Sequence, residues 1–454
     1  MTGKLHRGGQ RQEVPRYRRG MAFFACALAV LLAAVAPARA DDQKEKPRIV
    51  ALRCGRLLDV KTGKVERDQV IVVTGNKITA VGPAASVRIP EGAETIDLSK
   101  ATVLPGLADM HTHLIDDAEG YAVAGPLTRS GAQMAFGSIP HARATLDAGF
   151  TSVRDLGTYR AFVDVALRDA IDHGIIPGPR IQAAGAYVTI SGGAGAITHL
   201  APDIELPLEL RFGVADSPDQ VRQRVREIIR HGASVIKVLA TGAVLTPGST
   251  PGAQEFTEEE LRAAVEEAKK AGLKVACHAH GAAGAKAAIR AGVASIEHGS
   301  YLDEEALQMM KERGVFFVAD PYNSVAIYAN KNYPEEFMEK NRQTTDAQNR
   351  AIQRALAIGV RIAYGTDAAV IPHGDNGKQF ATYVELGMTP MQAIRTATTE
   401  AAELLGWSDR IGSIEAGKLA DIIAVRENPL ENVRTLEHVV FVMKNGKVFK
   451  NEVR

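Results

Sequence analysis

The sequence predicts an α/β fold in which a (β/α)8 TIM barrel carries a small β-sandwich domain. The chain has 454 residues, which is long enough for a large barrel and a smaller companion. Residues 104–411 alternate apolar strand-like runs with helical segments, which is the pattern of a (β/α)8 barrel. Residues 47–103 and 412–454 are β-rich instead, so we expect both ends of the chain to form one composite domain.

The first 40 residues have the order of a secretory signal peptide. Basic "RYRRGM" precedes apolar "AFFACALAVLLAAVA", and "ARA" follows before "DD". We therefore expect cleavage after Ala40 and a secreted or periplasmic mature protein. The apolar run is short for a membrane span and no other run is long enough, so no stable membrane insertion is expected.

The charge balance argues against a nucleic-acid partner. Residues 1–40 hold seven of the 54 Lys and Arg residues but one of the 53 acids, so the remaining chain is slightly acidic. We expect a small-molecule or dipeptide partner and a homo-oligomer. Cys54 and Cys277 lie in strand-like text far apart in the sequence, which favours buried free thiols over a disulfide.

Turn and capping signals place the other elements. In the C-terminal β-rich end, "KNGK" between apolar runs predicts a β-hairpin. Three helices in the middle region carry clear boundary signals. The signals are Ser217, Pro218 and Gly232 for the first helix, Thr257, Glu260 and Gly272 for the second, and Thr389, Pro390, Gln392 and Gly406 for the third.

Eight apolar runs are the candidate barrel strands. In chain order they are "LADMHTHL", "FTSVRDLG", "RIQAAGAY", "SVIKVLATG", "LKVACHAHG", "VASIEHGS", "GVFFVADP" and "VRIAYGTDAA". Five of them carry groups that suit a metal centre. These are His111 and His113 in strand one, Lys237 in strand four, His278 and His280 in strand five, His298 in strand six and Asp367 in strand eight.

These side chains predict a metal site. Active sites of such barrels lie at the carboxyl ends of the strands, so residues far apart in the sequence would meet at one end. Neutral imidazole and carboxylate groups are ligands for zinc and related divalent ions. Asp109 shares the strand face of His111 and His113 and is a candidate supporting acid.

Lys237 needs a separate explanation, because an ammonium group cannot bind a metal. Burial lowers the pKa of a lysine, and the free amine can react with carbon dioxide. The resulting carbamate has two oxygens that can bridge two ions. We therefore expect Lys237 to be carboxylated on its side-chain nitrogen.

The motifs "DMHTH", "VIKVLATG", "VACHAHG", "SIEHG" and "YGTDA" resemble the binuclear metal-dependent amidohydrolase superfamily. The resemblance is closest to its imidazolonepropionase-like and prolidase-like branch, which includes secreted dipeptidases and ochratoxin-hydrolysing amidohydrolases. It implies two divalent ions, most simply zinc, and attack by a hydroxide that bridges them. It assigns the first ion to His111, His113 and Asp367, the bridge to Lys237, and the second ion to His278 and His298.

The same resemblance implies catalytic roles for two residues. Asp367 would accept a proton from the attacking water and pass it to the leaving nitrogen. His280 would contact the scissile carbonyl or the oxyanion, or else support the ligands by a hydrogen bond.

The implied substrate is an amide or peptide bond next to a free carboxylate, as in a dipeptide, an N-acyl amino acid or an ochratoxin-like amide. Arg154 and His373 are candidate cations for that carboxylate, and Tyr322 is a further candidate substrate contact. Related sequences show "GGHG" after strand three, but this chain has "SGGAG". Ala194 stands at the histidine position, and His199 is a candidate substitute.

Two other functions stay open from the sequence. One is hydrolysis of a cyclic amide, such as a lactam or imidazolone, or of a lactone. The other is a non-catalytic metal-binding protein built on the same barrel. Metal analysis combined with hydrolysis assays would separate these possibilities.

Overall fold

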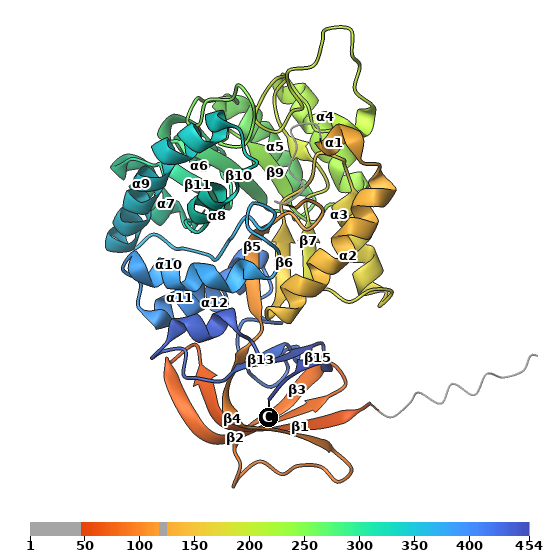
Figure 1. Ribbon diagram of the computed structural model, residues 1–454, viewed down its shortest axis with the longest axis vertical. Coiled ribbons are helices and arrows are strands. Elements are labelled where there is room, and N and C mark those ends of the chain that lie inside the picture. Colours follow the sequence, from red (N-terminus) through yellow and green to blue (C-terminus); the bar gives the residue numbers. More distant parts are fainter. Residues whose placement is uncertain (1–46, 118–124, 454) are drawn as a thin grey trace, which may run out of the picture. The chain divides into compact units, whose positions relative to one another are not determined.

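Figure 1 shows the computed structural model of the chain, which describes residues 47–117 and 125–453. The predicted signal peptide, residues 1–40, lies outside this part. Within the described residues, no helix combines the length and the apolar character that a membrane crossing requires. The fold is α/β.

Both ends of the described chain contribute to one seven-stranded sheet. Its order is β15-β14-β13-β4-β1-β2-β3, and β13 pairs antiparallel with β4. An apolar cluster from both ends fills one side of it, with Leu52, Val103, Ile422 and Phe441 fully buried. The strands are β1 (Ile49–Asp59), β2 (Lys64–Thr74), β3 (Lys77–Pro83), β4 (Glu94–Pro105), β13 (Ile422–Val425), β14 (Phe441–Lys444) and β15 (Lys447–Asn451).

The middle of the chain supplies two further sheets whose strands all pair in parallel. One has the order β5-β6-β7, with β5 (Leu107–Thr112), β6 (Phe150–Asp155) and β7 (Arg180–Ala183). The other has the order β12-β11-β10-β9-β8, with β8 (Tyr187–Val188), β9 (Ile236–Leu239), β10 (Val275–Gly281), β11 (Ser295–Tyr301) and β12 (Phe316–Val318).

The eighth predicted strand, residues 360–369, is not a continuous strand. Only isolated parallel bridges join it to its neighbours, from Ile362 to Phe317 in β12 and from Ala368 to Thr112 in β5. The backbone turns through positive φ angles at Asp367 (53°) and Ala369 (131°), which interrupts regular pairing.

Helices lie outside the two parallel sheets (Figure 1). They are α1 (Gly125–Thr128), α2 (Gly131–Asp147), α3 (Val163–Asp172), α4 (Pro218–Arg230), α5 (Glu258–Lys270), α6 (Ala282–Ala291), α7 (Glu304–Arg313), α8 (Asn323–Ala329), α9 (Glu335–Ile358), α10 (Gln379–Glu385), α11 (Pro390–Thr396) and α12 (Thr399–Leu405). Ser217 caps α4, and a Thr257–Glu260 capping box begins α5, as expected.

The helix expected to run from Pro390 to Gly406 is two helices. Its Thr389–Gln392 capping box is present, but α11 ends at Thr396 and α12 begins at Thr399. The break frees backbone carbonyls for the strands, because Tyr364 N donates to Thr396 O and Ala108 N donates to Ala397 O. Tertiary hydrogen bonds thus replace helical ones in the middle of the expected helix.

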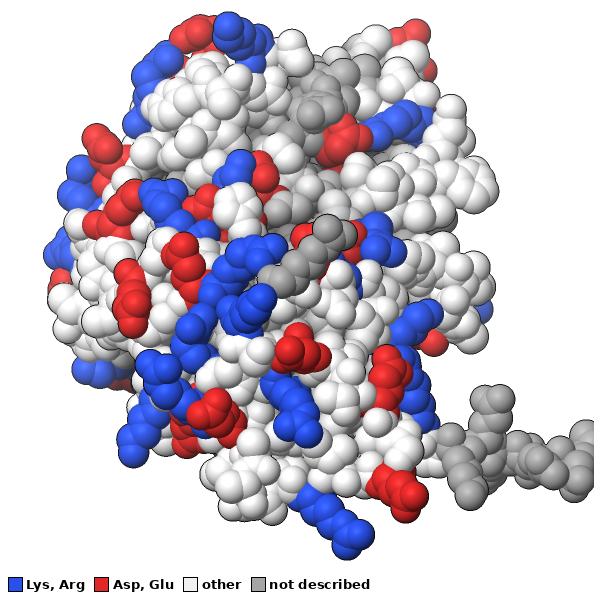
Figure 2. All heavy atoms as spheres, turned by 60° about the horizontal axis from the view of Figure 1, so that its bottom comes forward, with Lys and Arg blue, Asp and Glu red and all other residues white. Residues whose placement is uncertain are grey.

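Cys54 and Cys277 are buried free thiols, which confirms the expectation from the sequence. On the face seen in Figure 2, Lys and Arg side chains lie intermixed with Asp and Glu side chains.

Candidate metal centre

The candidate ligands meet at the carboxyl ends of the parallel strands. Two groups of side chains bring nitrogen or oxygen atoms within 4.8 Å of one another, so each group could hold a metal ion. The first group is His278, His280 and His298, and the second is His111, His298 and Asp367. Lys237 joins them, because its Nζ lies 3.3 Å from His111 Nε2.

These residues line a cavity of about 230 Å³. An apolar wall lies on one side, where Val244, Ile327 and Tyr333 pack against Leu245 and Val370. The cavity therefore combines a polar end with an apolar surface, as small-molecule sites commonly do.

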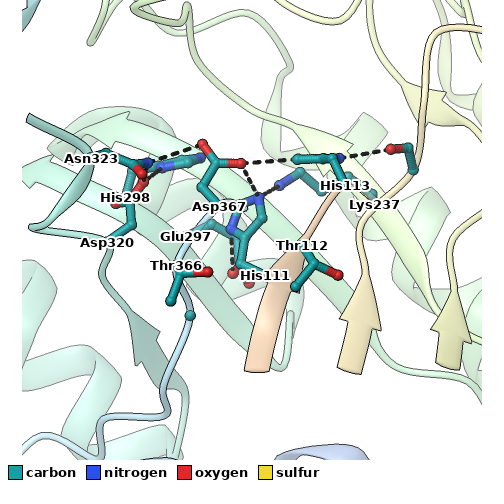
Figure 3. A network of polar contacts seen from close by, with 12 residues as sticks. His111, Thr112, His113, Lys237, Glu297, His298, Asp320, Asn323, Thr366 and Asp367 are labelled. Atoms are coloured by element: carbon teal, nitrogen blue, oxygen red, sulfur yellow. Dashed lines mark hydrogen bonds and ion pairs between the residues drawn. The ribbon is translucent and has the colours of Figure 1, made fainter. Parts of the chain in front are cut away.

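Figure 3 shows the imidazoles of His111 and His113 and the carboxylate of Asp367 pointing toward one another. Asp367 Oδ1 lies 3.1 Å from His113 Nε2 and 3.5 Å from His111 Nε2. Asn323 Nδ2 donates to the other carboxylate oxygen, Asp367 Oδ2, at 3.2 Å.

The Nδ1 atoms of His113 and His298 each face a neighbouring oxygen. His113 Nδ1 lies 2.7 Å from Gly157 O, and His298 Nδ1 lies 2.8 Å from Asp320 Oδ2 (Figure 3). Both partners accept hydrogen bonds, so each Nδ1 carries a proton, and Nε2 is the nitrogen that a neutral ring would offer to a metal ion. This is the usual arrangement behind a metal-binding histidine.

The donor set fits a metal ion. With Nδ1 protonated, a neutral His113 presents the lone pair of Nε2 to the negatively charged Asp367 carboxylate. Two lone pairs repel at 3.1 Å unless a cation, either a proton or a metal ion, lies between them. Imidazole nitrogen and carboxylate oxygen are together suited to zinc and related ions.

Burial and charge move the pKa values of these groups in opposite directions. Burial lowers the pKa of His111, His278 and His280 well below the usual range. Burial opposes the charged form of His113 too, but the hydrogen bond to Asp367 raises its pKa to about 9. The pKa of Lys237 is lowered by burial.

Two candidate ligands adopt backbone angles that residues with side chains rarely take. His298 has φ 66° and Asp367 has φ 53°. Non-glycine residues in this left-handed region cost about 1–3 kcal/mol and gather at functional sites. The turns direct both side chains into the cavity that they line.

Asp109 lies beneath the centre and joins two strand ends. Its carboxylate accepts hydrogen bonds from His111 N, Thr366 N, Thr366 Oγ1 and Asn376 Nδ2. Despite these bonds, burial raises its pKa to about 6. The supporting role expected of Asp109 therefore has a structural basis in its contact with His111.

Three predicted substrate contacts do not line the cavity and need correction. Arg154 is fully buried, and its guanidinium donates hydrogen bonds to Met110 O, Ser295 Oγ and Glu297 Oε1. Tyr322 lies beside a separate hollow. His373 donates toward Asp116 O and stacks on His141 at 4.3 Å. Side-chain direction decided these positions, and the sequence pattern revealed it neither for Arg154 inside β6 nor for Tyr322 and His373 outside the strands.

Two further predictions concern positions near the cavity. His199 is exposed and lies outside the cavity lining, so it does not replace a histidine at Ala194. His280 lines the cavity, and its Nδ1 lies 2.9 Å from Ser300 Oγ, so it has both a supporting contact and access to a ligand.

Sequence reasoning missed Arg129, which lines the cavity. Its Nη1 lies 3.1 Å from Asp117 Oδ2, and its side chain is 31% exposed. Asp320, Asn323 and Glu297 were also missed. The "EHG" and "DPYN" segments place these polar residues beside ligand or strand-end positions, which is the one local signal for them.

Comparison with known proteins agrees with this geometry. A model of the Amidohydrolase family matches residues 102–449. An ochratoxinase from Aspergillus niger is 36% identical over 414 residues, which cover 86% of this chain and 84% of that protein.

Two solved structures are also similar over most of the chain. A Xaa-Pro dipeptidase with methionine bound in its active site has a TM-score of 0.83 and 38% identity, covering 89% of this chain and 100% of that one. A prolidase complexed with N-methylphosphonate-L-proline has a TM-score of 0.81 and 30% identity, with the same coverage. The chain therefore belongs to the amidohydrolase family and is a hydrolase that acts on carbon–nitrogen bonds.

Proposed function

We propose that this protein hydrolyses an amide or peptide bond next to a free carboxylate, using two divalent metal ions. The observation that carries the proposal is the meeting of four histidines, Lys237 and Asp367 at the polar end of one cavity. The names of the relatives, an ochratoxinase and a Xaa-Pro dipeptidase, support a substrate of this class.

His111, His113 and Asp367 would hold one ion, and His278 and His298 the other, with Lys237 between them. Bound zinc would act as a Lewis acid and lower the pKa of a water molecule. His280 belongs to the same cluster as His278 and His298, and it lines the cavity where a substrate carbonyl would lie.

Lys237 is suited to carboxylation. Its side chain is 2% exposed, and its hydrogen-bond contact is to an imidazole nitrogen of His111 rather than to an acid. Burial lowers its pKa, which increases the share of neutral amine. The amine would form a bond to the carbon of carbon dioxide and release one proton, leaving an anion.

The surroundings of Asp367 support a role for it in moving the proton. Asn323 holds Oδ2, while Oδ1 faces the imidazoles of His111 and His113. A carboxylate held in this way can take a proton from the attacking water and deliver it to the leaving nitrogen.

The cavity walls suit an apolar group and a carboxylate. The surface formed by Val244, Ile327 and Tyr333 would hold an apolar or aromatic part of the substrate. Arg129 would bind the free carboxylate, because a guanidinium can make paired hydrogen bonds to it.

The backbone supports a closed (β/α)8 barrel around this site. Segment 361–368 is hydrogen-bonded on one side to β12, through Ala363 N to Phe317 O, and on the other side to β5, through Met110 N to Tyr364 O. Ser234 N donates to Ala183 O at the end of β7. The seven-stranded sheet would be the second domain, built from residues 47–103 and 412–454.

The test is a panel of dipeptides, N-acyl amino acids, their carboxamides and lactams, assayed with metal-loaded and chelated protein. We expect metal-dependent hydrolysis of the carboxylate substrates and a higher KM for the carboxamides. Arg129→Gln should remove most of that preference, while Arg143→Gln should not. Arg143 is the control because it pairs with Asp147 on the exposed part of α2 and does not line the cavity.

Two other results of this assay would overturn the proposed function. Turnover confined to ring substrates would replace the proposal with cyclic amide or lactone hydrolysis. Two bound metal ions without any hydrolysis across the panel would indicate a non-catalytic metal-binding protein.

A further inference from the structure

A buried charge pair lies directly behind the candidate metal ligand His111. Arg154 from β6 and Glu297 from β11 are 1% and 0% exposed at their side chains, and Arg154 Nη2 lies 2.8 Å from Glu297 Oε1. Glu297 Oε2 lies 3.2 Å from His111 Nδ1 (Figure 3). Buried ions are rare unless they are paired, so this group calls for a physical explanation.

The two oxygens of Glu297 face different partners. Oε1 accepts hydrogen bonds from Arg154 Nη2 and Ser295 Oγ. Oε2 and His111 Nδ1 are both buried and have no hydrogen-bond partner among the described residues, and the two atoms lie 3.2 Å apart. The carboxylate therefore spans the distance between a fixed guanidinium and one nitrogen of the ligand ring.

Arg154 is itself held in three directions. Its Nε donates to Met110 O at 2.7 Å, Nη1 donates to Ser295 Oγ at 3.0 Å, and Nη2 reaches Glu297. Met110 is the residue before His111, so the same guanidinium holds the strand and the carboxylate behind the ring. The planar, rigid guanidinium suits this role better than a flexible ammonium.

We propose that Arg154 and Glu297 are positioning residues that fix His111 with Nδ1 protonated and Nε2 free to bind a metal ion. This inference rests on the proposed metal site. Neither residue lines the cavity, so neither would touch the substrate. Their effect passes through the orientation and tautomer of the ring.

Glu297→Gln is the sharpest variant because it keeps the shape of the side chain. The guanidinium of Arg154 donates and needs an acceptor, so the amide oxygen should take the Oε1 position. The amide NH2 group then faces His111 Nδ1 and donates to it, which places the ring proton on Nε2. We expect the affinity for Zn²⁺ to fall about 10–100-fold, as when other partners of ligand histidines are removed.

The affinity is measured on full-length protein by competition with a coloured chelator. The absorption spectrum of the Co²⁺ form is a second readout, and it should change in Glu297→Gln because one nitrogen ligand is lost. A double variant, Glu297→Gln with Arg154→Met, frees the amide to turn round and should recover part of the affinity.

Arg180→Met is the matched control. Arg180 is also a buried arginine paired with a carboxylate, since its Nη1 lies 2.7 Å from Asp421 Oδ2. The side chains that accept hydrogen bonds from Arg180 are Ser152, Asp421 and Asn445, and none of them is a candidate ligand. It should lose stability and keep its metal affinity and Co²⁺ spectrum.

The outcomes separate this inference from the proposed function. If the unaltered protein binds neither Zn²⁺ nor Co²⁺, the metal site itself is wrong. If it binds them and folded Glu297→Gln binds with the same affinity and spectrum, the positioning role is wrong. A double variant that is no better than Glu297→Gln would remove Arg154 from the proposal.

Discussion

Asp109 and Asp367 show how neighbours decide the chemistry of one residue type. Burial raises the pKa of Asp109 to about 6 even though four hydrogen bonds favour its charged form. Burial also opposes the charge on Asp367, but the imidazoles of His111 and His113 hold its pKa below the usual range. Asp367 therefore stays ionised and could bind a metal ion. Asp109 instead connects β5 to the segment around Thr366 by hydrogen bonds.

Glu255 provides a pH test at the same scale. Both of its carboxylate oxygens lie 3.0 Å from Ala194 N, and burial raises its pKa from 4.5 to about 7. The folded protein thus binds this proton more tightly than the unfolded chain does. The resulting stability is complete below pH 4.5 and is lost as the pH rises through about 7.

We therefore expect Glu255→Gln to gain stability relative to the unaltered protein between pH 4.5 and 7, with a constant difference above that range. Thermal unfolding from pH 4 to 8.5 measures this. Glu312→Gln, which changes an exposed carboxylate on α7, is the control. Parallel pH curves for Glu255→Gln and the unaltered protein would show that Glu255 does not carry the effect.

At the scale of elements, the β14–β15 hairpin agrees with its sequence signal. Asn445 and Gly446 have φ angles of 50° and 74°, as the Asn-Gly turn between "VMK" and "KVF" predicts. Gly446 has a second reason to be glycine, because a Cβ there would lie 2.1 Å from Gly75 O. The turn thus joins the C-terminal hairpin closely to the N-terminal strands.

Gly446→Ala should lower stability more than Gly417→Ala does. Gly417 also has a positive φ, 93°, but a Cβ there would meet nothing within 4 Å. Backbone strain alone costs about 1–2 kcal/mol, and at position 446 the clash adds to it. Urea unfolding of both variants measures the difference in stability. Equal losses of stability would mean that the sheet accommodates the added methyl group at position 446 without a free-energy cost.

The broken helix α11–α12 shows where element prediction ends. The capping box at Thr389 is a local signal, and it is present. The helix ends at Thr396 because the carbonyls of residues 396 and 397 accept hydrogen bonds from Tyr364 N and Ala108 N. The helical periodicity of this segment does not predict that the helix breaks there.

At the scale of the whole molecule, the candidate ligands connect elements distant in sequence. They lie in or directly after β5, in β9, β10 and β11, and in the segment that follows residue 362. A metal ion that binds only the folded arrangement stabilises it by mass action, by about 4 kcal/mol when free metal exceeds Kd 1,000-fold.

Chelation should therefore lower Tm by several degrees, and added Zn²⁺ should restore it. The double variant His111→Ala/His113→Ala should stay folded, lose activity and the first metal ion, and show a smaller metal-dependent shift. Differential scanning calorimetry with metal analysis tests this. An unchanged shift in the double variant would mean that the metal binds elsewhere.

The sequence by itself determined the local features of this protein: strand alternation, helix caps, the hairpin turn, and the residue types of a metal centre. These signals follow from short-range geometry, since strand and helix periods place side chains within a few residues of one another. The prediction that histidines from several strands meet followed from the expected barrel, which would gather all strand ends at one side.

Only the tertiary structure decided which polar residues face the cavity and which lie behind it. The sequence suggests Arg154 as a substrate cation, but β11 brings Glu297 to it, so that Arg154 is a buried partner of Glu297, which faces His111. Arg129 gave no such signal, yet it lines the cavity. The reason is that these roles depend on contacts between distant segments, and no local pattern encodes the direction of a side chain toward a strand far away in the sequence.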